Sequence, residues 1–285
     1  MTIDLRTKFG PLSCKNPLGI ASGNLATNAK TTLAAMHAGA GVVEYKTITV
    51  DHLRTVNVGG RFATFPVGCA PAQSIARQNI EGISEHTLEK NLAELAEIHN
   101  GKPAGCLLGV SIMAPHDKPE LWEELMSKTS PFADYWANNL GCPQDVSERG
   151  MGAAVGKSAV LVANVAKITT ALGKKFGIPV YHKLTPNDCD PREPGLAALT
   201  NGGDGLLAIN TVRAIMGINR GTGCPVPTVG GKSCPGGMSG MAVRPIALRI
   251  CAELAQMMRG NGFSDRVLIG MGGINEGFNI AEFLM

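Results

Sequence analysis

Short apolar runs alternate along this chain with longer stretches of helical spacing. Such alternation is typical of repeated βα units, which fold into a parallel sheet covered by helices. Strands are predicted near Pro17–Ser22, Gly41–Thr47, Cys106–Ile112, Tyr135–Leu140, Ile178–Leu184, Gly205–Asn210 and Val267–Met271. Helices are predicted near Asn28–Ala38, Leu88–Ile98, Pro119–Lys128, Val160–Leu172, Pro194–Asn201, Pro245–Met258 and Gly277–Leu284.

This order of elements predicts an α/β fold, a TIM (β/α)8 barrel that lacks its eighth strand. The 285 residues contain no linker, internal repeat or low-complexity segment, so one domain is expected over 1–285, ending before the barrel closes. An open barrel leaves unpaired strand edges. Either the sequence is part of a longer chain, which we favour, or a partner supplies the strand.

Charge and cysteine usage exclude several classes of function. The 26 basic and 23 acidic residues are scattered, so no basic patch for nucleic acid is present. The eight cysteines include no C-x-x-C pair, so a zinc or iron–sulfur site lacks its usual spacing and no metal is expected. They indicate reduced thiols in a cytoplasmic protein. No apolar run reaches the ~18 residues of a membrane span.

Polar residues recur where the predicted strands end, which is where a barrel keeps its active site. Asn and Thr often cap turns, but their recurrence at several strand ends favours a shared site. A lysine at the end of an apolar run is costly to bury unless it meets an anion or an electron-rich ring. The residues concerned are Ser22, Lys46, Thr47, Asn139, Cys142, Lys183, Asn210 and Thr211.

Two long segments, Val50–Glu85 and Thr211–Val243, interrupt the alternation of strands and helices. Segments of this length in a compact domain are usually functional. In the first, we interpret Ser84 and Glu85 as capping residues of the helix near Leu88. Two earlier polar residues, Asn79 and Glu81, are then available for a ligand.

Two glycine-rich stretches, Gly236–Gly240 and Gly270–Ile274, are suited to binding phosphate. The first precedes a predicted helix and the second follows the seventh predicted strand. Backbone N–H groups near helix amino termini bind anions, and barrels often hold phosphate in their last loops. Glycine alone is weak evidence, because turns need it too.

Cys142 lies in the run Asn139-Leu140-Gly141-Cys142-Pro143-Gln144, where a predicted strand opens into a loop. Most cysteines behave as small hydrophobic residues. This position instead lets the sulfur face a ligand, as an acid, a base or a nucleophile. The segment from Ser147 to Gly152 is predicted to be a flexible loop that closes over the substrate.

Together these motifs resemble the flavin-dependent family that contains the cytosolic class 1 dihydroorotate dehydrogenases and the pyrimidine-reducing domain of dihydropyrimidine dehydrogenases. The resemblance extends over nearly the whole chain. Asn139 to Pro143 is similar to the N-L-S-C-P loop of the family, whose cysteine acts as acid or base. Similar to the dihydropyrimidine dehydrogenase branch are Ile83–Thr87, Glu148–Gly152, Lys183–Asn187, Ile209–Val212 and Ser239–Arg249.

The resemblance implies a barrel that binds FMN and interconverts uracil or thymine with its 5,6-dihydro form. Hydride would pass between flavin N5 and ring C6, with Cys142 as the proton donor to C5 and Lys183 stabilising charge at the flavin N1/O2 edge. FMN would be held by Ser22, Lys46, Thr47, Lys183, Gly240, Gly272 and Gly273. The pyrimidine would be held by Asn79, Glu81, Asn139, Asn210 and Thr211.

Glu81 favours uracil or thymine over orotate, because an unpaired carboxylate facing the orotate carboxylate is unfavourable in a dry site. Two residues depart from the family pattern. Gly141 replaces the usual serine, and Gln144 stands where the orotate enzymes carry an asparagine. Three alternatives stay open: a dihydroorotate dehydrogenase, another FMN or phosphate-binding barrel with Cys142 as nucleophile, and a scaffold subunit that has lost flavin.

The electron source lies outside the motifs found here. Complete dihydropyrimidine dehydrogenases pass electrons from NAD(P)H through iron–sulfur clusters, but this sequence has neither a G-x-G-x-x-G fingerprint nor cluster spacing. An electron-transfer partner with NAD(P)H, FAD or iron–sulfur centres is therefore expected, and the protein is expected to form a homo-oligomer.

Overall fold

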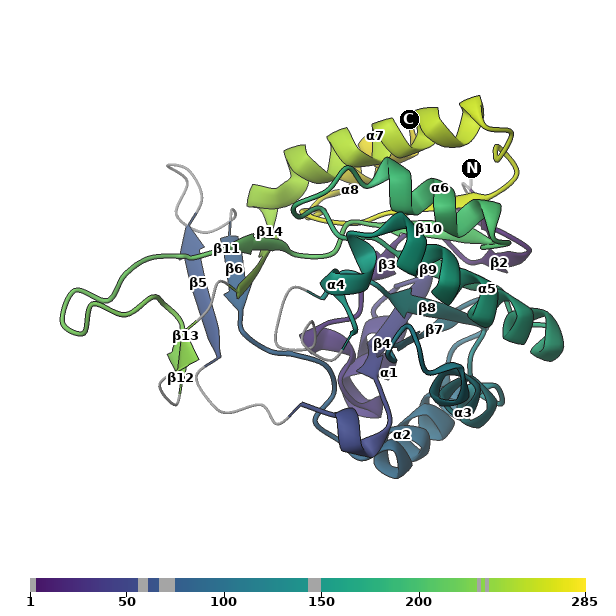
Figure 1. Cartoon of the computed structure of the whole chain (residues 1–285), viewed down its shortest axis with the longest axis horizontal. Helices are drawn as coiled ribbons and strands as arrows, with labels where there is room; N and C mark the ends of the chain where they lie inside the picture. Colours follow the sequence, from purple (N-terminus) through teal and green to yellow (C-terminus); the bar gives the residue numbers. More distant parts are fainter. Residues whose placement is uncertain (1–3, 56–60, 67–74, 143–149, 230–231, 234–235) are drawn as a thin grey trace.

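The computed structural model describes residues 4–55, 61–66, 75–142, 150–229, 232–233 and 236–285. Seven strands form one curled parallel sheet in the order β15-β10-β9-β8-β7-β4-β3 (Figure 1). The predicted α/β fold, an open barrel of seven parallel strands, is therefore confirmed. The strands are β3 (Gly19–Ile20), β4 (Val42–Ile48), β7 (Leu107–Ile112), β8 (Tyr135–Asn139), β9 (Val180–Lys183), β10 (Gly205–Ala208) and β15 (Val267–Gly270).

Helices cover the outer face of the curled sheet, and all seven predicted helices are present (Figure 1). Parallel neighbours need such crossovers, and the helices bury the outward side chains of the strands in one large apolar cluster. The helices are α1 (Ala29–His37), α2 (Leu88–Gly101), α3 (Pro119–Thr129), α4 (Ala153–Gly156), α5 (Ala159–Phe176), α6 (Arg192–Thr200), α7 (Arg244–Gly260) and α8 (Gly277–Leu284). Short 3-10 helices are η1 (Asn24–Ala26), η2 (Asp51–Leu53) and η4 (Met241–Val243).

The amino terminus of α2 differs from the prediction. The N-cap is Thr87, whose side chain accepts a hydrogen bond from the backbone N–H of Lys90, and not Ser84 or Glu85. Ser84 is buried, and its hydroxyl donates to Asn91 Oδ1 at 3.0 Å. Its backbone N–H donates to the carbonyl of Thr47 at 2.7 Å, so Ser84 ties the helix to the end of β4.

A hairpin that the sequence analysis did not predict closes the amino-terminal end of the sheet. It consists of β1 (Thr7–Phe9) and β2 (Leu12–Cys14). The Phe9 ring lies 5.1 Å from Tyr135 and 5.4 Å from Tyr181 between ring centroids, and Tyr181 Oη donates to the Phe9 carbonyl at 2.8 Å. An aromatic cluster therefore fills this end of the interior.

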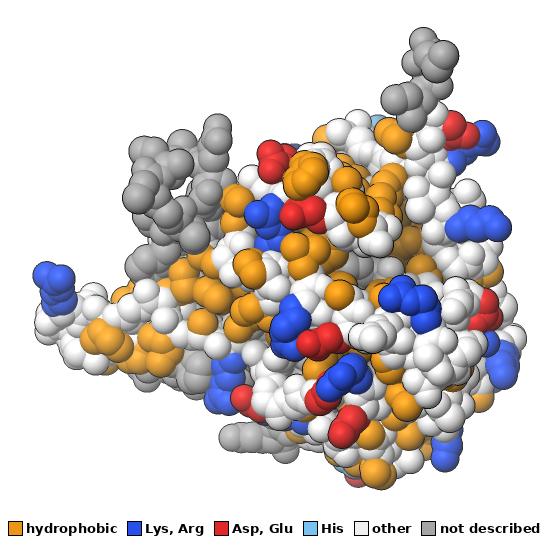
Figure 2. Space-filling view, turned by 90° about the horizontal axis from the view of Figure 1, so that it is seen from above, with side chains coloured by type: hydrophobic (Ala, Val, Ile, Leu, Met, Phe, Trp, Pro, Cys, Tyr) orange, Lys and Arg blue, Asp and Glu red, His pale blue; other side chains and the backbone are white. Residues whose placement is uncertain are grey.

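The two long segments that interrupt the alternation combine into one antiparallel sheet in the order β11-β14-β6-β5. It projects from the body of the molecule (Figure 1). Beyond β11, Ile215 and Ile218 are exposed, and Figure 2 shows hydrophobic side chains gathered on this projecting part. The strands are β5 (Phe62–Pro66), β6 (Ile75–Asn79), β11 (Val212–Ala214) and β14 (Gly236–Gly240), with a separate hairpin of β12 (Thr228–Val229) and β13 (Lys232–Ser233).

The six cysteines that the structure describes are free thiols. Within the described ranges, none of the helices has the length and apolar character that crossing a membrane requires.

Candidate active site

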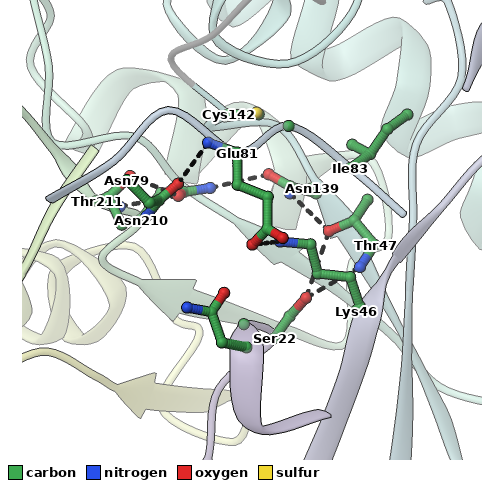
Figure 3. A pocket seen from close by; sticks show the side chains of 13 residues that line it. Ser22, Lys46, Thr47, Asn79, Glu81, Ile83, Asn139, Cys142, Asn210 and Thr211 are labelled. Carbon is green, nitrogen blue, oxygen red and sulfur yellow. Dashed lines mark hydrogen bonds and ion pairs between the residues drawn. The ribbon is translucent and has the colours of Figure 1, made fainter. Parts of the chain in front are cut away.

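A pocket with a volume of about 70 Å³ lies where the carboxyl ends of the parallel strands meet the antiparallel sheet (Figure 3). Nine of the thirteen site residues predicted from the sequence line it: Ser22, Lys46, Thr47, Asn79, Glu81, Asn139, Cys142, Asn210 and Thr211. The sequence analysis missed Gly23, Asn24, Gly82 and Ile83, which also line it and are neighbours in the chain of predicted residues. Lys183 and the three predicted glycines lie outside its described lining.

A bulge in β4 brings two consecutive side chains to this pocket. Tyr45 pairs with Val110 and Ile48 with Ile112, so β4 carries one residue more than β7 over this stretch. Successive side chains in a regular strand point to opposite faces, whereas a bulge redirects one of them. Lys46 and Thr47 therefore both line the pocket.

One carboxylate of the pocket pairs with two cations, one in the pocket lining and one beyond it. Lys46 Nζ lies 2.8 Å from Glu81 Oε2, and Arg61 Nη2 lies 3.0 Å from Glu81 Oε1. The Glu81 side chain is 6% exposed, so these contacts form in a poorly solvated place. Glu81 is therefore not the unpaired carboxylate that the sequence argument assumed, and repulsion by Glu81 alone does not select uracil over orotate.

Hydrogen bonds between amides and hydroxyls fix a second wall of the pocket (Figure 3). Asn139 Nδ2 donates to Thr47 Oγ1 at 2.9 Å, and Asn210 Nδ2 donates to Asn139 Oδ1 at 2.8 Å. The backbone N–H of Thr211 donates to Asn210 Oδ1 at 2.8 Å. On the other side of Thr47, its hydroxyl is 2.8 Å from that of Ser111. The orientation of both amides is thus set before a ligand binds.

Cys142 lies in the loop just after β8, which ends at Asn139. It packs against Ile83, Met113 and Met151, and 7% of the residue is exposed. Its backbone carbonyl accepts a hydrogen bond from Ala153 at 3.0 Å, which holds the loop against α4. Residues 143–149 lie outside the described residues, and with them Gln144 and the first half of the predicted closing loop.

Gly141 has a structural reason to lack a side chain. A Cβ at this position would lie 2.7 Å from Asn210 Cβ and 2.8 Å from Asn210 Nδ2. A residue with a side chain at position 141, such as the serine of the N-L-S-C-P motif, would therefore require Asn210 to move. The glycine lets Asn210 approach the loop closely enough to bond with Asn139.

Lys183 forms a second buried ion pair inside the sheet. Its Nζ lies 2.9 Å from Glu44 Oε1, and the two side chains are 5% and 2% exposed. Because β7 and β8 separate β4 from β9 in the sheet, this pair crosses the curled interior. Lys183 is the register partner of Asn139, which places it beside the pocket. The sequence analysis missed Glu44, although its spacing of two from Lys46 in a predicted strand was a signal for a shared face.

The three predicted glycines lie together at the amino terminus of α7. Gly240 precedes η4 and α7, whereas Gly272 and Gly273 follow β15. All three have positive φ, of 89°, 127° and 76°. A Cβ on Gly273 would lie 2.7 Å from Arg244 Cβ and 3.0 Å from the Gly240 carbonyl oxygen. Only glycine fits this close approach of two loops at a helix amino terminus.

The family model described as dihydroorotate dehydrogenase matches residues 4–285. The chain is 38% identical over 286 residues to a chloroplastic dihydropyrimidine dehydrogenase (NADP(+)) of Arabidopsis thaliana, covering 99% of this chain and 66% of that protein. It is 34% identical over 296 residues to the NAD-dependent dihydropyrimidine dehydrogenase subunit PreA of Escherichia coli (strain K12), covering 100% and 66%.

A third similar protein is the catalytic subunit of dihydroorotate dehydrogenase B (NAD(+)) of Pyrococcus abyssi. It is 32% identical over 279 residues, covering 97% of this chain and 82% of that subunit. The chain thus spans just under two thirds of the length of both dihydropyrimidine dehydrogenases and a larger share of the dihydroorotate dehydrogenase subunit.

Proposed function

Because the chain belongs to the dihydroorotate dehydrogenase family, we propose that it is an FMN-dependent oxidoreductase that interconverts uracil or thymine with its 5,6-dihydro form. The observation that carries the proposal is the pocket itself. The Cys142 thiol, the carboxamides of Asn79, Asn139 and Asn210, and a carboxylate converge there beside a lysine. The two dihydropyrimidine dehydrogenases of similar sequence support the choice of substrate.

The residues of the site fit FMN. Glycines whose close approach excludes a Cβ stand at the amino terminus of α7, where backbone N–H groups favour a phosphate. Lys46 and Lys183 supply positive charge, and Ser22 and Thr47 supply hydroxyls to a ring at the strand ends. FMN, when bound there, would supply or accept the hydride at C6 of the pyrimidine.

The carboxamides suit recognition of a uracil-like ring. Each carboxamide offers one acceptor and one NH₂ donor group, matching a ring edge that alternates carbonyl oxygens and N–H groups. Asn139 and Asn210 are already oriented by their contacts with Thr47 and with each other. A pyrimidine would exchange these internal hydrogen bonds for its own, with Asn79, Glu81 and Thr211 completing the ring of contacts.

Cys142 acts as the general acid in this proposal. In the reducing direction its Sγ–H proton goes to C5 while the hydride goes to C6, so the C5=C6 double bond becomes a single bond. The resulting thiolate regains a proton from solvent, and the reverse reaction uses the same thiolate as base. An unperturbed thiol has a pKa of about 8.5, near working pH. Ile83, Met113 and Met151 pack against Cys142 and hold it at the wall of the pocket.

The reaction needs a source or sink of two electrons. We assign this role to an electron-transfer subunit or domain that reacts with NAD(P)H through FAD or iron–sulfur centres. The similar protein from Escherichia coli is named as a subunit of an NAD-dependent enzyme, which supports such a partner. The free thiols fit a reducing compartment such as the cytoplasm.

Oxidation of dihydroorotate is the second candidate. Lys46 and Arg61 form ion pairs with the Glu81 carboxylate in the pocket, so cations that could meet a substrate carboxylate are present. The match with this chain covers 82% of the dihydroorotate dehydrogenase subunit, which also supports this second candidate.

Turnover by the purified, FMN-loaded chain tests the proposal, with artificial electron donors and acceptors and both substrate pairs. We expect turnover of uracil or thymine and their dihydro forms. Exclusive oxidation of dihydroorotate would establish the second candidate instead. A colourless protein that cannot be reconstituted with FMN would favour a scaffold without catalysis.

Replacing Cys142 with alanine tests the acid. We expect Cys142→Ala to lower kcat by roughly 10²- to 10⁴-fold while FMN content stays unchanged. Cys224→Ala is the matched control, because Cys224 lies in the segment after β11, away from the pocket lining. A covalent adduct trapped on Cys142 of the unmodified protein would instead identify a nucleophile.

A further inference from the structure

Glu44 places a carboxylate against Lys183, which lies beside the pocket where FMN is proposed to bind. We propose that Glu44 is a positioning residue. Its carboxylate offsets the positive charge of Lys183 and thereby lowers the reduction potential of the bound flavin. This inference rests on the proposed function, because it requires FMN beside Lys183. Nothing in the reaction itself requires a carboxylate at this point of the sheet.

The geometry makes Glu44 the immediate partner of Lys183. Their Nζ–Oε1 separation is 2.9 Å, and the carboxylate is 2% exposed. Glu44 comes from the middle of β4, where the opposite residue on β7 is Gly109. A side chain at Gly109 would collide with the ring of Tyr135, so the room beside Glu44 is taken by that ring. The Glu44 side chain is thus confined to the interior of the sheet.

The hydrogen bonding of this pair is incomplete. Glu44 Oε2 is buried and has no hydrogen-bond partner among the described residues. Lysine can donate three hydrogen bonds, and the structure directs one of them from Lys183 to Glu44 Oε1. A buried ion pair with remaining donor and acceptor capacity is expected to serve a further polar group. The N1/O2 edge of a flavin is an acceptor of that kind for Lys183.

The charge of Glu44 has a direct consequence for a flavin. Reduction adds electron density at the N1/O2 edge, so a nearby ammonium favours the reduced form. A carboxylate at hydrogen-bonding distance from that ammonium cancels much of its field, and the effect is strong because both groups are buried. Lys183 therefore orients the ring edge and donates a hydrogen bond, while Glu44 limits how far Lys183 favours reduction.

The test is the equilibrium between bound FMN and a reference redox dye, measured on the full-length FMN-loaded chain. Glu44→Gln keeps the shape and removes the charge. We expect it to shift the two-electron equilibrium about tenfold toward reduced flavin, equivalent to about 30 mV. Glu44→Asp keeps the charge but lengthens the gap to Lys183, so it should shift the equilibrium in the same direction by less.

Glu123→Gln is the matched control. It removes the same charge from an exposed ion pair with Lys175 and should leave the equilibrium at the wild-type value. If Glu44→Gln fails to fold, Glu44→Asp decides the question alone. A wild-type equilibrium in the folded Glu44 variants, with FMN bound, overturns this inference and leaves the proposed function standing. A wild-type chain that binds no FMN overturns both.

Discussion

The two ends of the curled sheet's interior are built from opposite chemistry. At the amino-terminal end, the rings of Phe9, Tyr135 and Tyr181 pack together under the β1–β2 hairpin. At the carboxyl-terminal end, the same strands present ion pairs and amides around a pocket. Burial of apolar rings stabilises the fold, whereas burial of an ion pair contributes little to stability.

Individual strands pass from one chemistry to the other within a few residues. On β9, Tyr181 belongs to the aromatic cluster, and Lys183 belongs to the ion pair with Glu44. Burial raises the pKa of the Tyr135 phenol well above its usual value, with a smaller contribution from the charge of Glu44, so that ring stays neutral. If this division is correct, substitutions at the two ends should separate stability from catalysis.

Truncating Phe9 should have the largest effect. Phe9→Ala removes the ring that touches both tyrosines and opens a cavity in the apolar cluster. We expect a loss of about 3–5 kcal/mol in the free energy of unfolding, measured by urea denaturation, with FMN affinity unchanged in the folded fraction. Phe278→Ala is the control, because Phe278 is 69% exposed. Weaker FMN binding without loss of stability would contradict the division.

The stability of the fold at low pH should depend on a buried histidine on the outer face of the sheet, which belongs to neither end of the interior. His182 lies on β9 between Tyr181 and Lys183 but faces the helices, and burial lowers its pKa to about 4 from the ordinary 6.5. The folded state therefore holds His182 neutral, while the unfolded state binds a proton below about pH 6.5. Stability should be complete above pH 6.5 and fall by about 3 kcal/mol as the pH approaches 4.

Urea denaturation at pH 7 and at pH 4.5 measures this effect. His182→Asn should flatten the difference between the two conditions, whereas His37→Asn should retain it, because His37 is exposed at the end of α1. A wild-type pH dependence in the His182 variant would contradict the assignment.

The parallel sheet could be predicted because each strand carries its own signal. The run Leu107–Ile112, for example, is apolar, short and followed by a loop. The β1–β2 hairpin escaped prediction because its strands have three residues each and no periodicity. The antiparallel sheet escaped for another reason. Gly237 of β14 pairs with Asn79 of β6, and no local pattern encodes a contact between such distant residues.

The site was predictable to the extent that it lies at strand ends. Lys46 and Asn139 each follow an apolar run, and parallel strands bring such positions together. Arg61 and Glu44 were missed because only their ion-pair partners make them important. Arg61 pairs with Glu81, and Glu44 pairs with Lys183 across the interior of the sheet. That the Glu81 carboxylate is paired could not be inferred without those contacts.

Adding a side chain at Gly141 should sharpen the description of the polar end. In Gly141→Ala the new Cβ meets Asn210, which must shift away from Asn139. We expect a loss of about 1–3 kcal/mol in stability and a higher KM for the pyrimidine, from urea denaturation and steady-state kinetics. Gly277→Ala is the control, since a Cβ there meets open space. An unchanged KM would place Asn210 outside the substrate contacts.

The smallest effect is expected for Ser111, which tests how far the polar end extends into the interior of the sheet. Ser111 is fully buried, and its hydroxyl lies 2.8 Å from that of Thr47, which Asn139 also contacts. Ser111→Ala should lower the free energy of unfolding by about 1 kcal/mol and loosen Thr47, reducing FMN affinity modestly in a fluorescence titration. Ser13→Ala, on the exposed face of the hairpin at the opposite end, should change neither quantity. If Ser111→Ala alters stability but leaves FMN affinity intact, Ser111 is not part of the binding site. The Thr47–Ser111 contact then serves only to stabilise the core.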